Sequence, residues 1–225
     1  MKYTGAKAES HYDNSHVYLM DCMDALRQTP DKYFDLAVVD PPYGIGANKM
    51  TLGNGKNKIY RGERDWDALA PDPSYFDLLK MKSQHMIIWG ANHFIDNFPF
   101  NINSPGWIVW DKGTGENDYA DGELAWSNYN KVLKIFRKSW VGANAKDGHL
   151  RIHPTQKPIA LYDWIYHNYL PQGGKVIDSH LGSGSNRISA DKAGNIEFYG
   201  FEIDSEYYEA QEKRYKIFKM QKRLF

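Results

Sequence analysis

VIDSHLGSGS at residues 176–185 and FYGFEID at residues 198–204 decide the fold of this chain. Together they predict a strand, a glycine-rich turn, a helix and a second strand that ends in an acidic residue. In such a unit the glycines let the backbone approach a ligand closely, and an acidic side chain about 20 residues later binds ribose hydroxyls. Because Arg187 stands where NAD-binding turns have a third glycine, and the Gly-Lys-Ser of phosphate loops is missing, the pattern indicates another nucleoside cofactor.

Strand-like runs alternate with helix-like segments along the chain. This alternation favours an α/β fold with a mostly parallel central sheet and helices on both faces. The predicted strands are residues 17–20, 36–39, 85–89, 107–110, 176–178 and 198–203. Ligands of such sheets bind at the carboxyl ends of the strands. Four acidic residues fall at or just beyond such ends, and we expect them in one cleft: Asp21, Asp40, Asp178 and Glu202.

The segment Asp40-Pro41-Pro42-Tyr43 directly follows one of these strands. A carboxylate and a carbonyl held by two prolines can accept both hydrogens of an exocyclic amine, while an adjacent aromatic ring stacks on the base. The alternative is an ordinary proline-stiffened turn, since Asp, Pro and Gly are common in turns. The cofactor turn later in the chain favours a site that reacts at an amino group.

With a third motif, HPTQKP at residues 153–158, the chain resembles the DNA amino-methyltransferases that use S-adenosylmethionine, in their permuted "beta" order. In that order the catalytic motif precedes the cofactor turn. The resemblance runs from about Val17 to the C-terminus. It implies a Rossmann-like methyltransferase fold, S-adenosylmethionine as cofactor and S-adenosylhomocysteine as product, with no metal.

The resemblance also implies the site residues. The catalytic residues would be Asp40, Pro41, Pro42 and Tyr43. The cofactor would be bound by Asp21, Cys22, His153, Thr155, Gln156, Lys157, Asp178, His180, Gly182, Ser183, Gly184, Ser185 and Glu202. Among these, residues 155–157 would hold the methionine carboxylate, unless residues 153–158 merely begin a helix. Glu202 is preferred to Asp204 for the ribose hydroxyls, because Asp204 lies beyond the expected strand end.

The cofactor turn departs from the usual Asp-Pro-Phe-x-Gly-Ser-Gly-Thr of that family at Ser179, His180 and Ser185. His180 puts a titratable ring where the family has an apolar wall. We therefore expect cofactor affinity to vary between about pH 6 and about pH 7.

Composition fits a single domain over residues 1–225, with a catalytic half at about 17–140 and a cofactor-turn half at about 150–225. Loops at about 44–64 and 142–153 would interrupt it, without a large separate target-recognition domain. The 28 basic and 28 acidic residues cancel, so net charge neither supports nor excludes DNA as a partner. The single cysteine excludes an intramolecular disulfide, and no apolar stretch approaches a membrane span, so we expect a cytoplasmic protein.

Within the resemblance, Asp at the first motif position favours N6 of a flipped adenine in DNA as the target. N4 of cytosine is the alternative, followed by an RNA or protein-amide methyltransferase and by a non-catalytic cofactor- or DNA-binding module. The aromatic and basic segment 126–140 is either a nucleic-acid face or a strand pair with core aromatics. A second copy of the chain and a cognate restriction enzyme are candidate partners.

Overall fold

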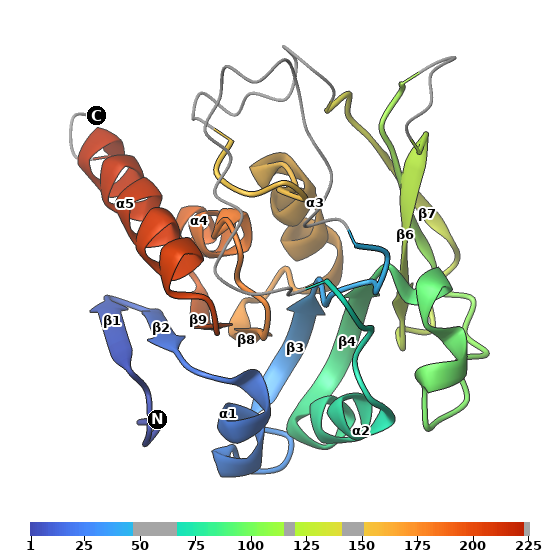
Figure 1. Ribbon diagram of the computed structural model, residues 1–225. Coiled ribbons are helices and arrows are strands. Elements are labelled where there is room, and N and C mark those ends of the chain that lie inside the picture. Colours follow the sequence, from blue (N-terminus) through green and yellow to red (C-terminus); the bar gives the residue numbers. More distant parts are fainter. Residues whose placement is uncertain (47–66, 115–119, 141–150, 223–225) are drawn as a thin grey trace.

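The computed structural model describes residues 1–46, 67–114, 120–140 and 151–222 of the chain, and one twisted sheet runs through them (Figure 1). Within these residues the sheet has nine strands in the order β1-β2-β9-β8-β3-β4-β6-β5-β7. Its centre is parallel, as expected from the sequence. The central strands are β2 (Ser15–Leu19), β9 (Ile196–Glu202), β8 (Gly174–Asp178), β3 (Phe34–Val39) and β4 (Ser83–Trp89).

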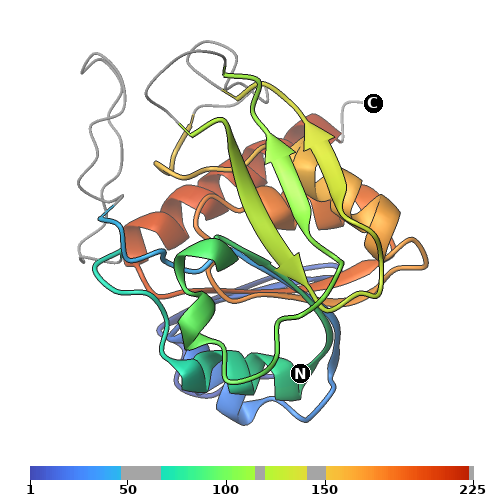
Figure 2. The ribbon, with the colours of Figure 1, turned by 90° about the vertical axis from the view of Figure 1, so that its right-hand side faces the viewer.

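The two margins of the sheet contain antiparallel pairs. At one margin β1 (Ala8–Tyr12) pairs with β2. At the other, β6 (Gly122–Ser127) runs antiparallel to β4 and to β5 (Ile108–Asp111), and β7 (Lys134–Arg137) runs parallel to β5. Figure 2 shows these last three strands on the side facing the viewer. All six predicted strands are present, whereas β1, β6 and β7 were not predicted.

Helices cover both faces of the sheet (Figure 1). On one face lie α1 (Cys22–Gln28) and α2 (Pro73–Lys82), and on the other α3 (Ile159–Tyr169), α4 (Ser185–Ala193) and α5 (Ser205–Lys222). Two short 3-10 turns, η2 (Ala91–His93) and η3 (Ile95–Asn97), follow β4. Successive side chains of a strand point to opposite faces. Accordingly, Leu36 and Val38 of β3 enter the core with α3, whereas Ala37 and Val39 enter the core with α1 and α2.

The predicted halves of the chain share this one sheet, because β3 of the catalytic half lies between β8 and β4. The loops predicted at 44–64 and 142–153 fall mostly on residues 47–66 and 141–150, which lie outside the described residues. Among the helices that the structure describes, none has the length and apolarity to cross a membrane.

Candidate active site

The strand order brings the four predicted acidic residues to one edge of the sheet. Because β2, β9, β8 and β3 are neighbours with parallel directions, Asp21, Glu202, Asp178 and Asp40 all follow or close strands at the same edge. Burial raises the pKa of Asp178 to about 7, and the nearby charges of Asp40 and Glu202 add to this effect. Three carboxylates are therefore close enough to influence one another.

The segment Asp40–Tyr43 forms a fixed turn at the end of β3. The backbone N–H groups of Tyr43 and Gly44 both donate to Oδ1 of Asp67, at 2.7 and 3.1 Å. The Tyr43 hydroxyl donates to Oδ1 of Asp40 at 2.8 Å. Asp67, which sequence reasoning did not single out, is buried and holds the turn in place.

The ring of Tyr43 packs against the segment that follows β4. It stacks on His93 with 4.9 Å between ring centroids and 17° between planes. On Gly90, which has φ of +71°, a Cβ would lie 2.0 Å from Cε1 of Tyr43. The ring can take this position only because residue 90 has no side chain.

Lys157 joins Asp40 to a second carboxylate, Glu123. Its ammonium Nζ lies 2.6 Å from Oδ2 of Asp40 and 2.9 Å from Oε2 of Glu123, and only 1% of its side chain is exposed. Lys112 Nζ lies 2.7 Å from the other oxygen of Glu123. These contacts place Lys157 against the catalytic motif. Its expected role in holding the cofactor carboxylate stays a prediction.

Glu123 was not predicted as a site residue. It lies in β6, which reaches this edge because it runs antiparallel to β4, with Trp89 opposite Ala125. The short apolar run Leu124-Ala125-Trp126 is the signal in the sequence that could have revealed this strand.

The glycine turn between β8 and α4 wraps around two buried carboxylates. Gly182 and Gly184 have φ of +50° and +70°, values that favour glycine. The Gly182 N–H donates to Oε2 of Glu202 at 2.8 Å. Asp178 accepts hydrogen bonds from the Asn186 side chain and the His180 N–H, at 3.0 and 3.2 Å. Burial raises the pKa of Glu202 to about 7, so both acids are held in a region poor in water.

Asp204 and Glu202 have different surroundings. Oδ1 of Asp204 accepts from the N–H groups of Glu206 and Tyr207, at 2.9 and 3.1 Å, so it caps the start of α5. Glu202 accepts from the Gly182 N–H of the glycine turn on Oε2, and from the N–H groups of Ile203 and Asp204 on Oε1. The preference for Glu202 over Asp204 at the ribose hydroxyls stays a prediction.

The HPTQKP segment folds against the glycine turn. A Cβ on Gly182 would lie 3.5 Å from the His153 ring. His153 Nδ1 lies 3.1 Å from the Thr155 hydroxyl, and burial lowers the pKa of this histidine to about 3. The Gln156 side chain accepts from the Ile152 N–H at 3.0 Å. Of the three residues predicted to hold a carboxylate, Thr155 contacts His153, Gln156 contacts Ile152, and Lys157 contacts Asp40.

His180 is a neutral ring in this turn. Burial lowers its pKa to about 4. Its Nδ1 lies 2.9 Å from the Ser179 hydroxyl, and its Nε2 lies 3.9 Å from the Cys22 sulfur. A lowered pKa argues against a change in the charge of His180 between about pH 6 and about pH 7, and the expected change in cofactor affinity stays a prediction.

The remaining predicted residues have local structural contacts. Asp21 caps α1 by accepting the Met23 N–H at 2.8 Å. The hydroxyls of Ser183 and Ser185 lie 3.2 Å apart, and Arg214 donates to the Ser183 carbonyl at 2.7 Å. All of these residues lie at the carboxyl edge of the sheet or in the turn beside it.

The two tryptophans of segment 126–140 are core residues. Trp126 and Trp140 are buried, and their indole N–H groups donate to the carbonyls of Ile102 and Gln156, at 2.8 and 2.6 Å. Their rings are therefore not available for stacking on bases. The strand pair with core aromatics is the interpretation that the structure supports.

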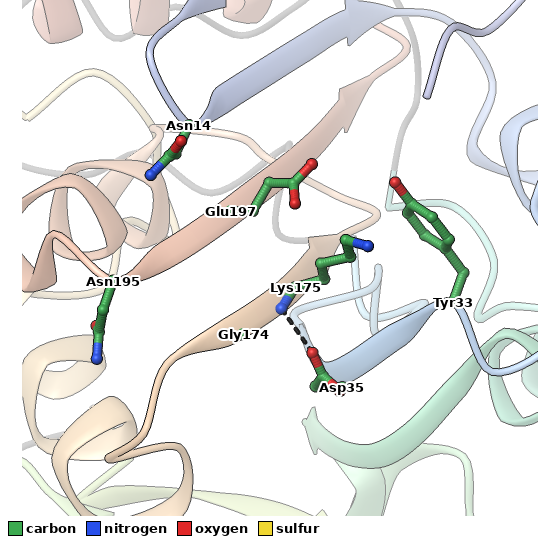
Figure 3. Close-up of a pocket in the computed structure, with 7 residues that line it drawn as sticks. All are labelled: Asn14, Tyr33, Asp35, Gly174, Lys175, Asn195 and Glu197. Atoms are coloured by element: carbon green, nitrogen blue, oxygen red, sulfur yellow. Dashed lines mark hydrogen bonds between the residues drawn. The ribbon is translucent and has the colours of Figure 1, made fainter.

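A polar pocket of about 430 Å³ lies at the opposite edge of the sheet (Figure 3). Its lining comes from the turns and residues where β2, β3, β8 and β9 begin: Asn14, Tyr33, Asp35, Gly174, Lys175, Asn195 and Glu197. It is therefore separate from the cluster of carboxylates at the strand ends.

Comparison with known proteins agrees with this geometry. A family described as DNA methylase, of the N6 and N4 type, matches residues 75–213, more than half of the chain. The type II methyltransferase M2.MboI of Moraxella bovis is 24% identical over 92% of this chain and 89% of its own length.

Solved methyltransferase structures share the fold. A complex of M1.HpyAVI with SAM has a TM-score of 0.53 at 18% identity, covering 88% of this chain and 97% of that one. The cytosine-N4-specific PvuII DNA methyltransferase has a TM-score of 0.58 at 14% identity, covering 92% and 89%. The family match includes the glycine turn, Lys157 and Glu123, and it begins after Tyr43. This chain belongs to the N6/N4 DNA methylase family.

Proposed function

We propose that this DNA amino-methyltransferase transfers a methyl group from S-adenosylmethionine to N6 of an adenine flipped out of DNA. The proposal rests on one observation above all. The Asp40–Tyr43 turn ends β3, and the glycine turn follows β8, the strand paired directly with β3. An amine held by the first turn would therefore lie beside a cofactor held by the second.

The glycine turn fits S-adenosylmethionine. Gly182 and Gly184 give the turn its positive φ angles of +50° and +70°, with which its backbone could lie close to the cofactor. Glu202 would accept the ribose hydroxyls, residues 178–185 would surround the methionine part, and Asp21 with Cys22 would lie near the adenine edge. When bound, this cofactor supplies a methyl group already activated on sulfonium sulfur.

The protein's own contribution is then to place the amine. Oxygens of the Asp40 carboxylate and the Pro41 carbonyl would accept its two hydrogens, which favours a pyramidal nitrogen with a free lone pair. Asp40 would also lie beside the positive charge that develops on this nitrogen. Tyr43 would stack on the base, which must leave the duplex at a cost of about a few kcal/mol.

Adenine is proposed because Asp occupies the first position of the motif. Cytosine N4 is the alternative, because the same pair of acceptors would hold that amine and a cytosine-N4-specific enzyme shares the fold.

Mass spectrometry of nucleosides tests the proposal, using DNA from cells that express the wild type, Asp40→Ala or Asp24→Ala. Asp24 pairs with Arg27 on an exposed face of α1 and serves as the matched control. We expect N6-methyladenine with the wild type and Asp24→Ala, and a decrease of at least about a hundredfold with Asp40→Ala. N4-methylcytosine would reverse the base assignment, and the absence of any modified base would reject the activity.

A further inference from the structure

The ion cluster around Asp40 has contacts that methyl transfer alone does not explain. Both Asp40 oxygens are engaged, Oδ1 by the Tyr43 hydroxyl at 2.8 Å and Oδ2 by Lys157 at 2.6 Å. A carboxylate oxygen has two acceptor positions, so each can still accept a hydrogen from a substrate amine. Lys157 also donates to the Tyr43 hydroxyl at 3.3 Å, so one buried ammonium contacts both functional side chains of the motif.

The elements that bring this ammonium to Asp40 are far apart in sequence. Lys157 lies just before α3, Glu123 lies in β6, and Lys112 follows β5. Glu123 accepts from Lys157 on one oxygen and from Lys112 on the other, at 2.9 and 2.7 Å. The two carboxylates and two ammonium groups have no net charge together.

We infer that Lys157 and Glu123 are positioning residues for the proposed reaction, which keep Asp40 ionised and correctly oriented to accept the hydrogens of the substrate amine. This inference rests on the proposed function. A carboxylate buried without a cation becomes protonated, and a protonated carboxyl would donate where the amine needs an acceptor. Lys157 opposes this protonation, although burial still leaves the pKa of Asp40 above its usual value. Glu123 shares the ammonium, so that Asp40 keeps enough negative charge to bind the amine strongly.

The electrostatics of the cluster support this division of roles. Burial raises the pKa of Asp40, Lys157 opposes this rise, and Glu123 adds to it. Burial would also raise the pKa of Glu123, but Lys157 and Lys112 outweigh it and bring it to about 2. Among the residues that the structure describes, the other titratable groups that interact with Asp40 are Tyr43, Tyr75, Tyr162 and Asp178.

Two substitutions should therefore move the activity profile in opposite directions. Lys157→Met removes the cation that lowers the pKa of Asp40, so the acid limb of the rate profile moves to higher pH. Glu123→Gln removes the negative charge that raises it, so the acid limb moves to lower pH. A side chain with only a structural role would not give shifts of opposite sign.

The experiment measures single-turnover methylation of unmethylated bacterial genomic DNA from about pH 5 to about pH 9, with labelled S-adenosylmethionine. We expect each limb to move by about one pH unit. We also expect the plateau rate of Lys157→Met to fall about a hundredfold. The control is Lys175→Met, which removes a lysine from the polar pocket at the far edge of the sheet and should leave the profile unchanged.

Cofactor affinity of each variant is measured by calorimetry. A Kd within about twofold of the wild type is expected for both, whereas loss of affinity in Lys157→Met would return Lys157 to the cofactor site. Shifts in the same direction, or none, would also overturn the inference. If Lys157→Met does not fold, the nearly isosteric Glu123→Gln decides the question by the sign of its shift. If the wild type methylates DNA but the acid limbs of the two variants do not move, only this inference is rejected. If the wild type has no activity, the proposed function is rejected as well.

Discussion

At Gly90 a missing side chain determines where an aromatic ring can lie. Replacing this residue by alanine puts a Cβ about 2.0 Å from the Tyr43 ring, which must then move. We expect Gly90→Ala to lower the methylation rate at least about tenfold, because small displacements of positioning groups slow reactions strongly, and to leave cofactor affinity unchanged. The measurements are the single-turnover rate and calorimetric titration with S-adenosylmethionine.

Gly113→Ala is the matched control for this prediction. Gly113 also has positive φ, of +55°, but a Cβ there would meet no atom of the described residues within 4 Å. Both variants carry similar backbone strain of about 1–2 kcal/mol, so equal loss of activity in the two would show that strain, and not the position of the Tyr43 ring, is responsible.

Single residues also show what the sequence could and could not predict at the site. Asp40, Tyr43 and the glycine turn are recognisable because their chemistry is contained in a few consecutive residues. The contact between Lys157 and Asp40 is not recognisable in this way, because the two residues are 117 positions apart in the chain. Glu123 and Asp67 were missed for the same reason, because their roles depend on which strands and turns meet.

At the scale of elements, the start of α5 separates the roles of two neighbouring acids. Asp204→Ala removes two hydrogen bonds to the first turn of the helix. We expect it to lower the free energy of unfolding by about 1–2 kcal/mol, measured by urea denaturation, with cofactor affinity retained. We expect Glu202→Ala to abolish cofactor binding and to leave the protein folded. If only Asp204→Ala lost cofactor binding, Asp204 and not Glu202 would be the residue that binds the cofactor.

The elements themselves were predicted where their sequence is strongly apolar. The central strands contain runs such as Leu36–Val39, which are buried on both faces. In contrast, β1 alternates partly buried and exposed residues, and β7 is mostly exposed. Such marginal strands form because a neighbour offers hydrogen bonds, and a pattern read along one segment does not contain that neighbour.

At the scale of the whole molecule, Arg187 ties three parts of the fold together. Its guanidinium is fully buried, and its Cζ lies 3.7 Å from the centroid of the Tyr215 ring. Its Nε donates to the Ser15 hydroxyl at 2.8 Å, and its Nη1 donates to Oε1 of Glu212 at 2.5 Å. These contacts join α4 to β2 and α5. They explain why an arginine stands where a nucleotide-binding glycine could have been, since it serves packing and not the ligand.

We expect Arg187→Met to lower the free energy of unfolding by about 3–5 kcal/mol, because it leaves the Glu212 charge without its cation. Lys192→Met, in the same helix, removes an ion pair with Asp163 in which the lysine side chain is 45% exposed. This substitution should cost less than about 1 kcal/mol. Urea denaturation of both variants measures the difference. Similar values for the two would mean that the buried pair contributes little to stability.

The alternation of side chains along β3 restricts which insertions and deletions this chain can tolerate. Leu36 and Val38 belong to one core, and Ala37 and Val39 belong to the other. One extra residue within β3 would exchange the two sets and carry Asp40 to the opposite face of the sheet, away from Lys157. Two extra residues would restore the two faces, but they would move Asp40 about 7 Å further along the strand. Insertion or deletion of one residue between Phe34 and Asp40 would therefore disrupt the packing of the core and the position of the catalytic carboxylate together.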